Sequence, residues 1–254
     1  MDTLLFIVFL GIVIFSSIYG YFEISKLKDK EITERFKVKH YRKTILDGWL
    51  MVIVVLAVSA VRRISLKDIG ITTPNSTSFD VSILIKVIVF IVCGLLLLNL
   101  IYQIIGFLSS ESFRMQIVKQ VEKSEANESR FNKVLYKIIV PRTFREKVWF
   151  ALMSATAGIG EEIVYRGFLS YHLMRHFPEW PLALLIISAG IIFGFAHFYQ
   201  GITGIVRTSI LGTAFGALYI SSGSLLPGII LHFIIDVSAN FLKPSAKGDA
   251  YTKI

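Results

Sequence analysis

Long apolar runs separated by polar stretches are the main pattern along this chain of 254 residues. A transmembrane helix needs about 20 consecutive, mostly apolar residues. The pattern predicts an all-α fold, a polytopic membrane helical bundle with about seven transmembrane helices. The predicted helices cover residues 3–22, 45–61, 81–108, 148–173, 182–199, 203–221 and 225–242.

Composition supports membrane embedding. Hydrophobic residues make up 54% of the chain and charged residues 18%, and the mean hydropathy is +0.65. A soluble domain of this length is rarely so apolar. The first run, residues 3–22, has no Lys or Arg before it and no clear cleavage site after it, so we expect a retained helix rather than a signal peptide. Cys93 is the only cysteine, which excludes a disulfide or a Cys-based zinc site within one chain.

The net charge of +9 comes mainly from basic residues between the apolar runs. Residues 26–43 carry eight Lys or Arg against three acids, and residues 110–147 carry nine against five. By the positive-inside rule both segments and the C-terminal tail are expected in the cytoplasm, with the N-terminus outside. Arg62, Arg63 and Lys67 do not fit this scheme. The charge pattern therefore indicates orientation in a membrane rather than nucleic-acid binding, and we expect that membrane to be the plasma membrane of a bacterium.

Residues 110–147 are too polar to span a membrane, but apolar side chains recur in them at helical spacing. Two interpretations remain open, amphipathic helices on the inner leaflet or a solvated helical linker. Pro141 is expected to end this stretch. We expect three parts, namely N-terminal transmembrane helices with this basic segment (1–147), a core (148–243) and a cytoplasmic tail (244–254). The apolar positions are Phe113, Ile117, Val121, Phe131, Val134, Leu135 and Ile138.

A few polar residues interrupt the apolar runs, and these carry the chemical information. A charge at mid-bilayer costs roughly 2.5 to 3.5 kcal/mol, so each needs a partner or a function. In the fourth run, GIGEEIVYRGF, Glu162 and Arg166 are four residues apart and can form an ion pair on one helix face. Glu161 is rotated by about 100° from Glu162 and needs another partner. Glu161 is therefore available for chemistry.

Two later runs contribute histidines. In IIFGFAHFYQ, Phe193 and His197 share a helix face, and in LLPGIILHFIIDVSAN, His232 and Asp236 are four apart. A water held among a carboxylate and these histidines can be deprotonated and directed at a carbonyl, as peptide hydrolysis requires. Each residue also has a simpler interpretation, as a structural ion pair or a packed histidine, and proton-coupled transporters use buried Glu and His as well.

The three motifs together, E-E-x-x-x-R at 161–166, F-x-x-x-H at 193–197 and H-x-x-x-D at 232–236, resemble the CAAX-protease and bacteriocin-processing (Abi, type II CAAX prenyl endopeptidase-like) family of intramembrane proteases. The resemblance covers roughly residues 148–242. The stretch ISLKDIGIT at 64–72 also resembles an upstream loop of that family.

The resemblance implies that the transmembrane helices enclose a polar, water-filled cavity, and it implies roles for the motif residues. Glu161 would be the general base that activates water, and His197 would help to hold that water. His232 and Asp236 would stabilise the oxyanion, while Glu162, Arg166 and Phe193 would support the site. The family has Asn or Asp at the last motif position, and an aspartate donates a hydrogen bond only when protonated. Tyr165 replaces a Phe that is common before the Arg.

The resemblance thus implies an endopeptidase that acts on a membrane-associated or lipidated protein or peptide, with membrane lipids as partners. The alternative is a non-catalytic regulator or bacteriocin-immunity protein of the same family. Older descriptions call the family metalloproteases, and zinc could be held by Glu161, Glu162, His197 and His232. Because H-E-x-x-H is absent, we prefer no cofactor and a water activated by Glu161.

Overall fold

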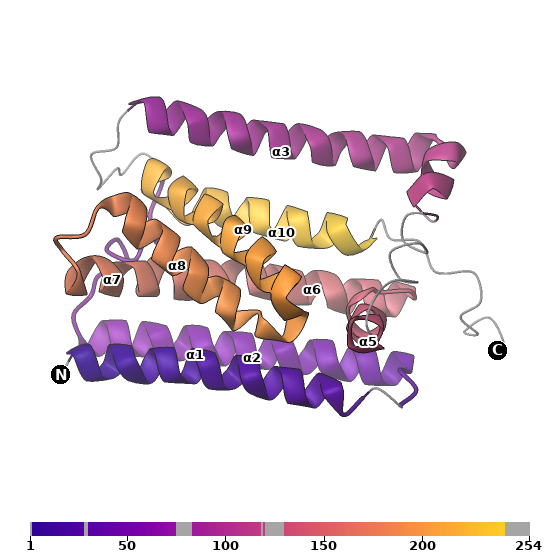
Figure 1. The fold of residues 1–254 in the computed structure, drawn as a ribbon, viewed down its shortest axis with the longest axis horizontal. Helices are drawn as coiled ribbons and strands as arrows, with labels where there is room; N and C mark the ends of the chain where they lie inside the picture. The colour runs from indigo at the N-terminus through magenta and orange to yellow at the C-terminus, as the bar shows by residue number, and fades with distance from the viewer. Residues whose placement is uncertain (1, 28–29, 75–82, 118, 120–129, 242–254) are drawn as a thin grey trace.

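A computed structural model describes residues 2–27, 30–74, 83–117, 119 and 130–241 (Figure 1). Across these ranges the chain forms helices and no strands, which confirms the all-α fold class. Most of the long helices lie along the long axis of the molecule, and α3 runs along one side of it. The predicted tail, residues 244–254, lies outside the described residues.

The helices differ from the predicted runs mainly at their ends. In the N-terminal half they are α1 (Asp2–Ser25), α2 (Glu34–Val61), α3 (Ile83–Ser109) and α5 (Arg130–Ile139), with further helical turns at 111–117. In the C-terminal half they are α6 (Phe144–Glu161), the π-helix η1 (Glu162–Leu169), α7 (Ser170–His176), α8 (Leu182–Ala196), the 3-10 turn η2 (Phe198–Gln200), α9 (Gly201–Ser222) and α10 (Leu226–Phe241).

Three described helices are long and apolar enough to cross a membrane, namely Phe6–Ser25, Glu34–Val61 and Phe198–Ser222. The second begins eleven residues before the predicted run at 45–61, because the Thr33 side chain accepts a hydrogen bond from the Phe36 N–H and caps the helix there. The exact number of about seven spans remains a prediction.

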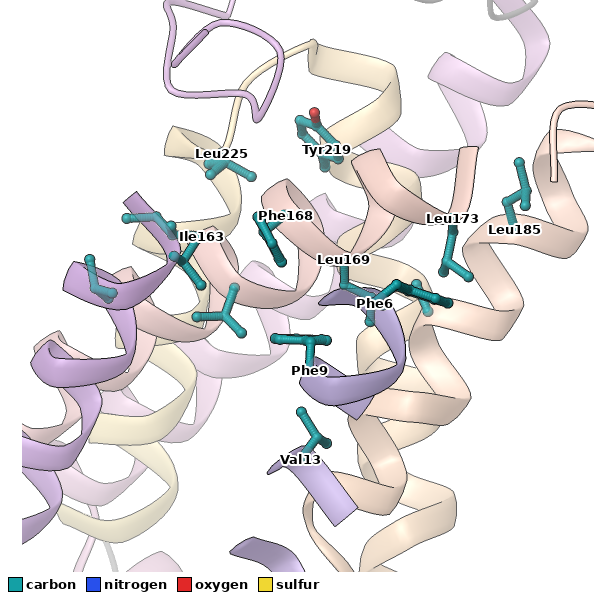
Figure 2. Packing of buried hydrophobic residues seen from close by; sticks show 14 of the residues in the cluster. Phe6, Phe9, Val13, Ile163, Phe168, Leu169, Leu173, Leu185, Tyr219 and Leu225 are labelled. Atoms are coloured by element: carbon teal, nitrogen blue, oxygen red, sulfur yellow. The ribbon is translucent and has the colours of Figure 1, made fainter. Parts of the chain in front are cut away.

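One continuous helix passes through the middle of the bundle, formed by α6, η1 and α7. Its buried apolar side chains, among them Phe168 and Leu169, pack against Phe6 and Phe9 of α1 (Figure 2). Tyr219, at the end of α9, belongs to the same cluster. Helices α1 and α9, which are distant in sequence, therefore both pack in the cluster around this central helix.

Glycines bring α8 and α9 into close contact. A Cβ atom at Gly190 or Gly194 would overlap Thr213 or Ser209 of α9, and one at Gly212 would lie 2.9 Å from the Phe193 ring. Small residues at four-residue spacing are a common means of close helix packing in membranes, where there is no hydrophobic drive between helices. This packing fixes the position of Phe193 at the helix crossing.

The loop after α2 contains the 64–72 stretch and packs onto the C-terminal half. Ile69 is fully buried, and its carbonyl oxygen lies only 2.6 Å from the position that a Cβ atom of Gly167 would take, so glycine fits best at 167. Gly70 has a φ of 76° and accepts a hydrogen bond from the Leu225 N–H at 2.9 Å. The loop therefore connects η1 to the beginning of α10.

Helix α5 is amphipathic, but protein covers its apolar face. Phe131, Val134 and Ile138 are buried in a cluster with Ile24 and Ile32. Lys133 and Lys137 are exposed on the opposite face. The apolar face of α5 thus packs against protein rather than lipid. The helix ends at Ile139, before Pro141, as predicted, whereas Val121 lies outside the described residues.

A buried charge cluster, which the sequence did not indicate, connects α2 to the start of α6. The Lys37 ammonium donates to Glu146 Oε2 and to the Val140 carbonyl, both at 2.6 Å. Glu146 Oε2 also accepts from the Arg142 N–H at 2.6 Å. The hydroxyl of Tyr41 donates to the Ile138 carbonyl at 2.9 Å. We call Lys37 and Glu146 the structural pair.

Candidate active site

The first motif lies where the central helix changes from α to π geometry. Glu161 is the last residue of α6, and Glu162 is the first residue of η1. The side chain of Glu162 is 1% exposed, whereas that of Glu161 is 28% exposed. Single π-helical turns are frequent at functional sites. Two adjacent acids are thus separated into a buried one and an accessible one.

The predicted ion pair between Glu162 and Arg166 is confirmed. Glu162 Oε1 lies 3.2 Å from Arg166 Nη1, and both side chains are buried. The guanidinium lies over the Phe193 ring, with its Cζ 4.1 Å from the centroid, and 5.2 Å from the Phe215 centroid. Such cation–π contacts stabilise a desolvated arginine. The pair therefore joins η1 to α8 and α9.

His232 lies between the two glutamates. Its Nδ1 is 3.1 Å from Glu162 Oε1, and because an ionised carboxylate only accepts, Nδ1 carries the proton in this hydrogen bond. Its Nε2 faces Glu161 Oε2 at 3.7 Å and Asp236 Oδ2 at 3.9 Å. The ring stacks on Phe215 at a centroid distance of 5.3 Å. Glu162 therefore orients His232 so that Nε2 points to the accessible acids.

His197 lies at the end of α8 rather than inside the helix predicted for 182–199. The helix ends at Ala196, and the chain turns through η2 to Gly201, whose φ of 75° favours glycine. Nδ1 of His197 is 2.9 Å from the Phe193 carbonyl oxygen, which only accepts, so Nδ1 carries a hydrogen. Nε2 then faces Glu161 Oε2 at 3.9 Å. As predicted, Phe193 and His197 are in contact, at a ring distance of 4.6 Å.

The first helix supports this turn, although the sequence indicated no role for it at the site. The Ser17 hydroxyl lies 2.9 Å from the Ala196 carbonyl oxygen and donates to it and to the Val13 carbonyl. The Tyr21 ring packs edge-on against Phe198 at 5.6 Å. Helix α1 thus contacts the residues on both sides of His197, the Ala196 carbonyl and the Phe198 ring.

The structure brings five predicted site residues together from three parts of the chain. Glu161 and Glu162 come from the α6–η1 junction, His197 follows α8, and His232 and Asp236 are on α10. The separations of 3.7 and 3.9 Å from Glu161 to the two Nε2 atoms exceed a direct hydrogen bond. One water molecule can reach all three groups at such separations. The arrangement can therefore hold and deprotonate a water.

The four residues considered for zinc do not surround one point. Glu162 contacts Nδ1 of His232, while Glu161 contacts the opposite ring nitrogen, and the nearer Glu162 oxygen also pairs with Arg166. Within the described part of the chain, no three His, Cys, Asp or Glu side chains are arranged to hold a metal ion. The structure thus does not support a common zinc site for Glu161, Glu162, His197 and His232.

The three long apolar helices and the family match given next indicate an integral membrane protein. Residues 143–238 match the model of the family described as type II CAAX prenyl endopeptidase Rce1-like, and this match confirms the CAAX-protease part of the resemblance. It includes all three motifs. Neither a curated protein nor a solved structure matches the chain.

Proposed function

We propose that this protein is an intramembrane endopeptidase that hydrolyses a peptide bond in a membrane-associated or lipidated protein or peptide. The observation that carries the proposal is the position of Glu161, a partly exposed carboxylate that faces the Nε2 atoms of His197 and His232. The family match over residues 143–238 supports an endopeptidase in general terms. The glutamate-dependent mechanism below is our own inference.

In the proposed reaction Glu161 takes a proton from a water that His197 helps to hold. The water oxygen bonds to the carbonyl carbon, and the carbonyl electron pair moves to the oxygen to give a tetrahedral oxyanion. When the C–N bond breaks, the leaving amine takes the proton from Glu161. His232, when Nε2 is protonated, and Asp236, when its carboxyl is protonated, stabilise the oxyanion. Glu161 returns to its starting form.

Glu162 and Arg166 support this chemistry without taking part in it. Glu162 is fully buried and contacts Arg166 and Nδ1 of His232. A buried carboxylate on one imidazole nitrogen fixes the orientation of the ring and the position of its protons. Phe193 supports both Arg166 and His197 by ring contacts.

The rival proposal is a non-catalytic membrane regulator or a bacteriocin-immunity protein. A regulator does not need an accessible carboxylate opposite two imidazole nitrogens, whereas this chain places Glu161 in that position. The arrangement of the site therefore favours the enzyme. We include bacteriocin precursors among the substrate classes to be tested.

We also propose the domain division and the topology given by the basic segments. The core spans residues 148–243, and residues 1–147 and 244–254 form the N-terminal helices and the tail. The segments at 26–43 and 110–147 face the cytoplasm of a bacterium. Lys133→Cys in a Cys93→Ser background tests this, because Lys133 is exposed. Labelling from outside intact cells contradicts the topology.

The central experiment compares protein termini in the membranes of cells with the wild-type protein and cells with Glu161→Gln. New termini that appear only with the wild type support an endopeptidase and identify its substrates. A quenched fluorescent peptide with a prenylated CAAX end then serves as a probe for the purified protein. Identical termini in both strains, together with wild-type biological function in the Glu161→Gln strain, favour the regulator.

The preference for a metal-free mechanism has a separate test. Activity is expected to persist after prolonged treatment with chelators, with less than stoichiometric zinc in the purified protein. A loss of activity that zinc alone reverses would reject the metal-free mechanism. A bound zinc would then activate the water by lowering its pKa to about 7.

A further inference from the structure

We propose that Phe215 is a further positioning residue of this site, and that its ring holds His232 and Arg166 in place. The inference rests on the proposed function. None of the three sequence motifs includes Phe215, which lies within α9, between the second and third motifs. Its side chain is buried and packs in a cluster with Leu218 and Leu231. We assign Phe215 no contact with the substrate, so its effect on catalysis acts through these two neighbours.

The first neighbour is the imidazole of His232. The two ring centroids are 5.3 Å apart and the ring planes are inclined by 22°, so the rings are stacked. The hydrogen bond from Nδ1 to Glu162 Oε1, at 3.1 Å, fixes one atom of the imidazole. It does not fix the ring plane, because the torsion that turns a histidine ring has only a broad preference. The stacked Phe215 ring fixes that plane, and with it the direction of Nε2 toward Glu161.

The second neighbour is the guanidinium of Arg166. Its Cζ lies over two rings, 4.1 Å from the Phe193 centroid and 5.2 Å from the Phe215 centroid. Its Nη2 is buried and has no hydrogen-bond partner among the residues that the structure describes. A buried cation with an unused donor is costly, and the negative face of an aromatic ring offsets part of that cost. Phe215 thus stabilises the cation that pairs with Glu162.

Phe215 and Glu162 therefore hold the same two groups by different means. Glu162 contacts Arg166 at 3.2 Å and His232 at 3.1 Å through its carboxylate. Phe215 contacts the same two side chains through its ring. The four residues belong to η1, α9 and α10. Without the Phe215 ring, Arg166 and His232 would each lose one of these contacts, and the direction of Nε2 would be less well defined.

Two glycines place Phe215 at this point. A Cβ atom at Gly212 would lie 2.9 Å from the Phe193 ring, and one at Gly216 would lie 3.0 Å from the Ile186 side chain. Glycine at both positions therefore lets α9 approach α8 closely. Phe215 lies between these glycines in the sequence. The close approach brings the rings of Phe193 and Phe215 to the same guanidinium.

The first test removes the ring and keeps an apolar side chain. In Phe215→Leu we expect kcat to fall by roughly 10- to 100-fold, because a small misplacement of a catalytic group costs about that much, and KM to stay near the wild-type value. Phe215→Tyr keeps the ring and should retain most of the activity. Cleavage is measured with a peptide that the terminal comparison identifies, or with the prenylated probe.

Phe150→Leu is the matched control for this test. Phe150 is also a buried ring, and it packs edge-on against Tyr41 in the first half of α6. Its replacement should lower stability and leave kcat per folded molecule unchanged. A wild-type kcat in Phe215→Leu, or equal losses of kcat in the two leucine variants, overturns the proposal.

The second test changes the electrostatics of the ring and keeps its shape. A ring-fluorinated phenylalanine at position 215 has a less negative face and therefore attracts a cation less strongly. We expect kcat to fall to a value between those of the wild type and Phe215→Leu. The same replacement at position 150 should leave kcat unchanged. An unchanged kcat with the fluorinated ring at 215 contradicts the role assigned to the ring face.

A third measurement does not depend on any substrate. The NMR signals of the His232 ring hydrogens, identified by their loss in His232→Gln, should move in Phe215→Leu, because an aromatic ring shifts the signals of atoms stacked on it. The signals of His40, on α2, should stay in place. Unmoved His232 signals overturn the contact. If the wild type cleaves nothing, the proposed function fails, and this measurement still decides the contact. If the wild type and Phe215→Leu are equally active, only the role of Phe215 fails.

Discussion

Two buried glutamates, Glu146 and Glu162, each pair with a cation inside the protein, but their surroundings differ. Glu146 accepts from Lys37 and from the Arg142 N–H through one oxygen, each at 2.6 Å, and Lys37 also donates to a backbone carbonyl. Glu162 pairs with Arg166 at 3.2 Å and also contacts His232. His232 in turn leads to Glu161 and Asp236, whose side chains are 28% and 36% exposed.

The comparison shows how two similar buried pairs can serve different ends. A buried ion pair is costly to desolvate and is stable only when further hydrogen bonds satisfy its members. The structural pair is satisfied by the backbone where α5 connects to α6, so it holds that connection to α2. Glu162 and Arg166 instead orient a histidine toward accessible acids. The connection to accessible titratable groups, rather than the buried pair itself, marks the candidate site.

The largest expected effect is at the candidate site. Glu161→Ala, His197→Ala and His232→Ala should each reduce cleavage by roughly 10⁴-fold or more, because residues that act as a unit fail together. Cleavage of the prenylated probe or of an identified substrate measures the loss. All three proteins should insert and accumulate like the wild type. Wild-type biological function in all three variants would contradict the catalytic role of the residues to which Glu162 and Arg166 lead.

The next effect is on stability, at the structural pair. Lys37→Met leaves Glu146 buried without its cation and should lower the free energy of unfolding by about 3–5 kcal/mol. Denaturant unfolding in detergent micelles measures this change. The double variant Lys37→Met with Glu146→Leu should recover most of the loss, since no buried charge then remains. The rate per folded molecule should stay unchanged, and a specific loss of activity would contradict a purely structural role.

A smaller effect is expected at Asp236 and tests whether it donates a hydrogen bond. Asp236→Ala should lower kcat by roughly 100-fold, whereas Asp236→Asn should retain activity and hold it to higher pH, because an amide always donates. The rates of the three proteins are compared across pH. A folded and inserted Asp236→Asn protein without activity would show that Asp236 acts as an anion instead.

The smallest effect is expected at Ser17. Ser17→Ala removes the hydrogen bond to the Ala196 carbonyl and should lower the free energy of unfolding by about 1 kcal/mol, with a small loss of activity. Ser16→Ala is the matched control, because Ser16 donates to the Val13 carbonyl within α1. Equal effects of the two substitutions would mean that the contact between α1 and α8 does not position His197.

The sequence predicted the helical fold because apolar runs of membrane-spanning length are visible along a single chain. It also predicted the contacts at four-residue spacing, such as Glu162 with Arg166 and Phe193 with His197, since these follow from helix geometry alone. Contacts between segments that are distant along the chain could not be predicted from the sequence. Lys37 and Glu146 are 109 residues apart, and nothing near either residue indicates the other.

Local deviations from regular helix were also not predicted. The end of α8 at Ala196 depends on the turn at Gly201 and on the hydrogen bond from Ser17.

The π-helix has a consequence for the length of the chain at the site. Widening a helix over η1 accommodates a surplus residue compared with regular α geometry, as an insertion would. Deleting one residue between Glu162 and Arg166 would let the helix continue as α, and the residues beyond it would stay near their present faces because the surplus residue is the one removed. Arg166 would then follow Glu162 by three residues instead of four, and the ion pair would lose its present geometry. The site thus depends on the number of residues in this turn as well as on their identity.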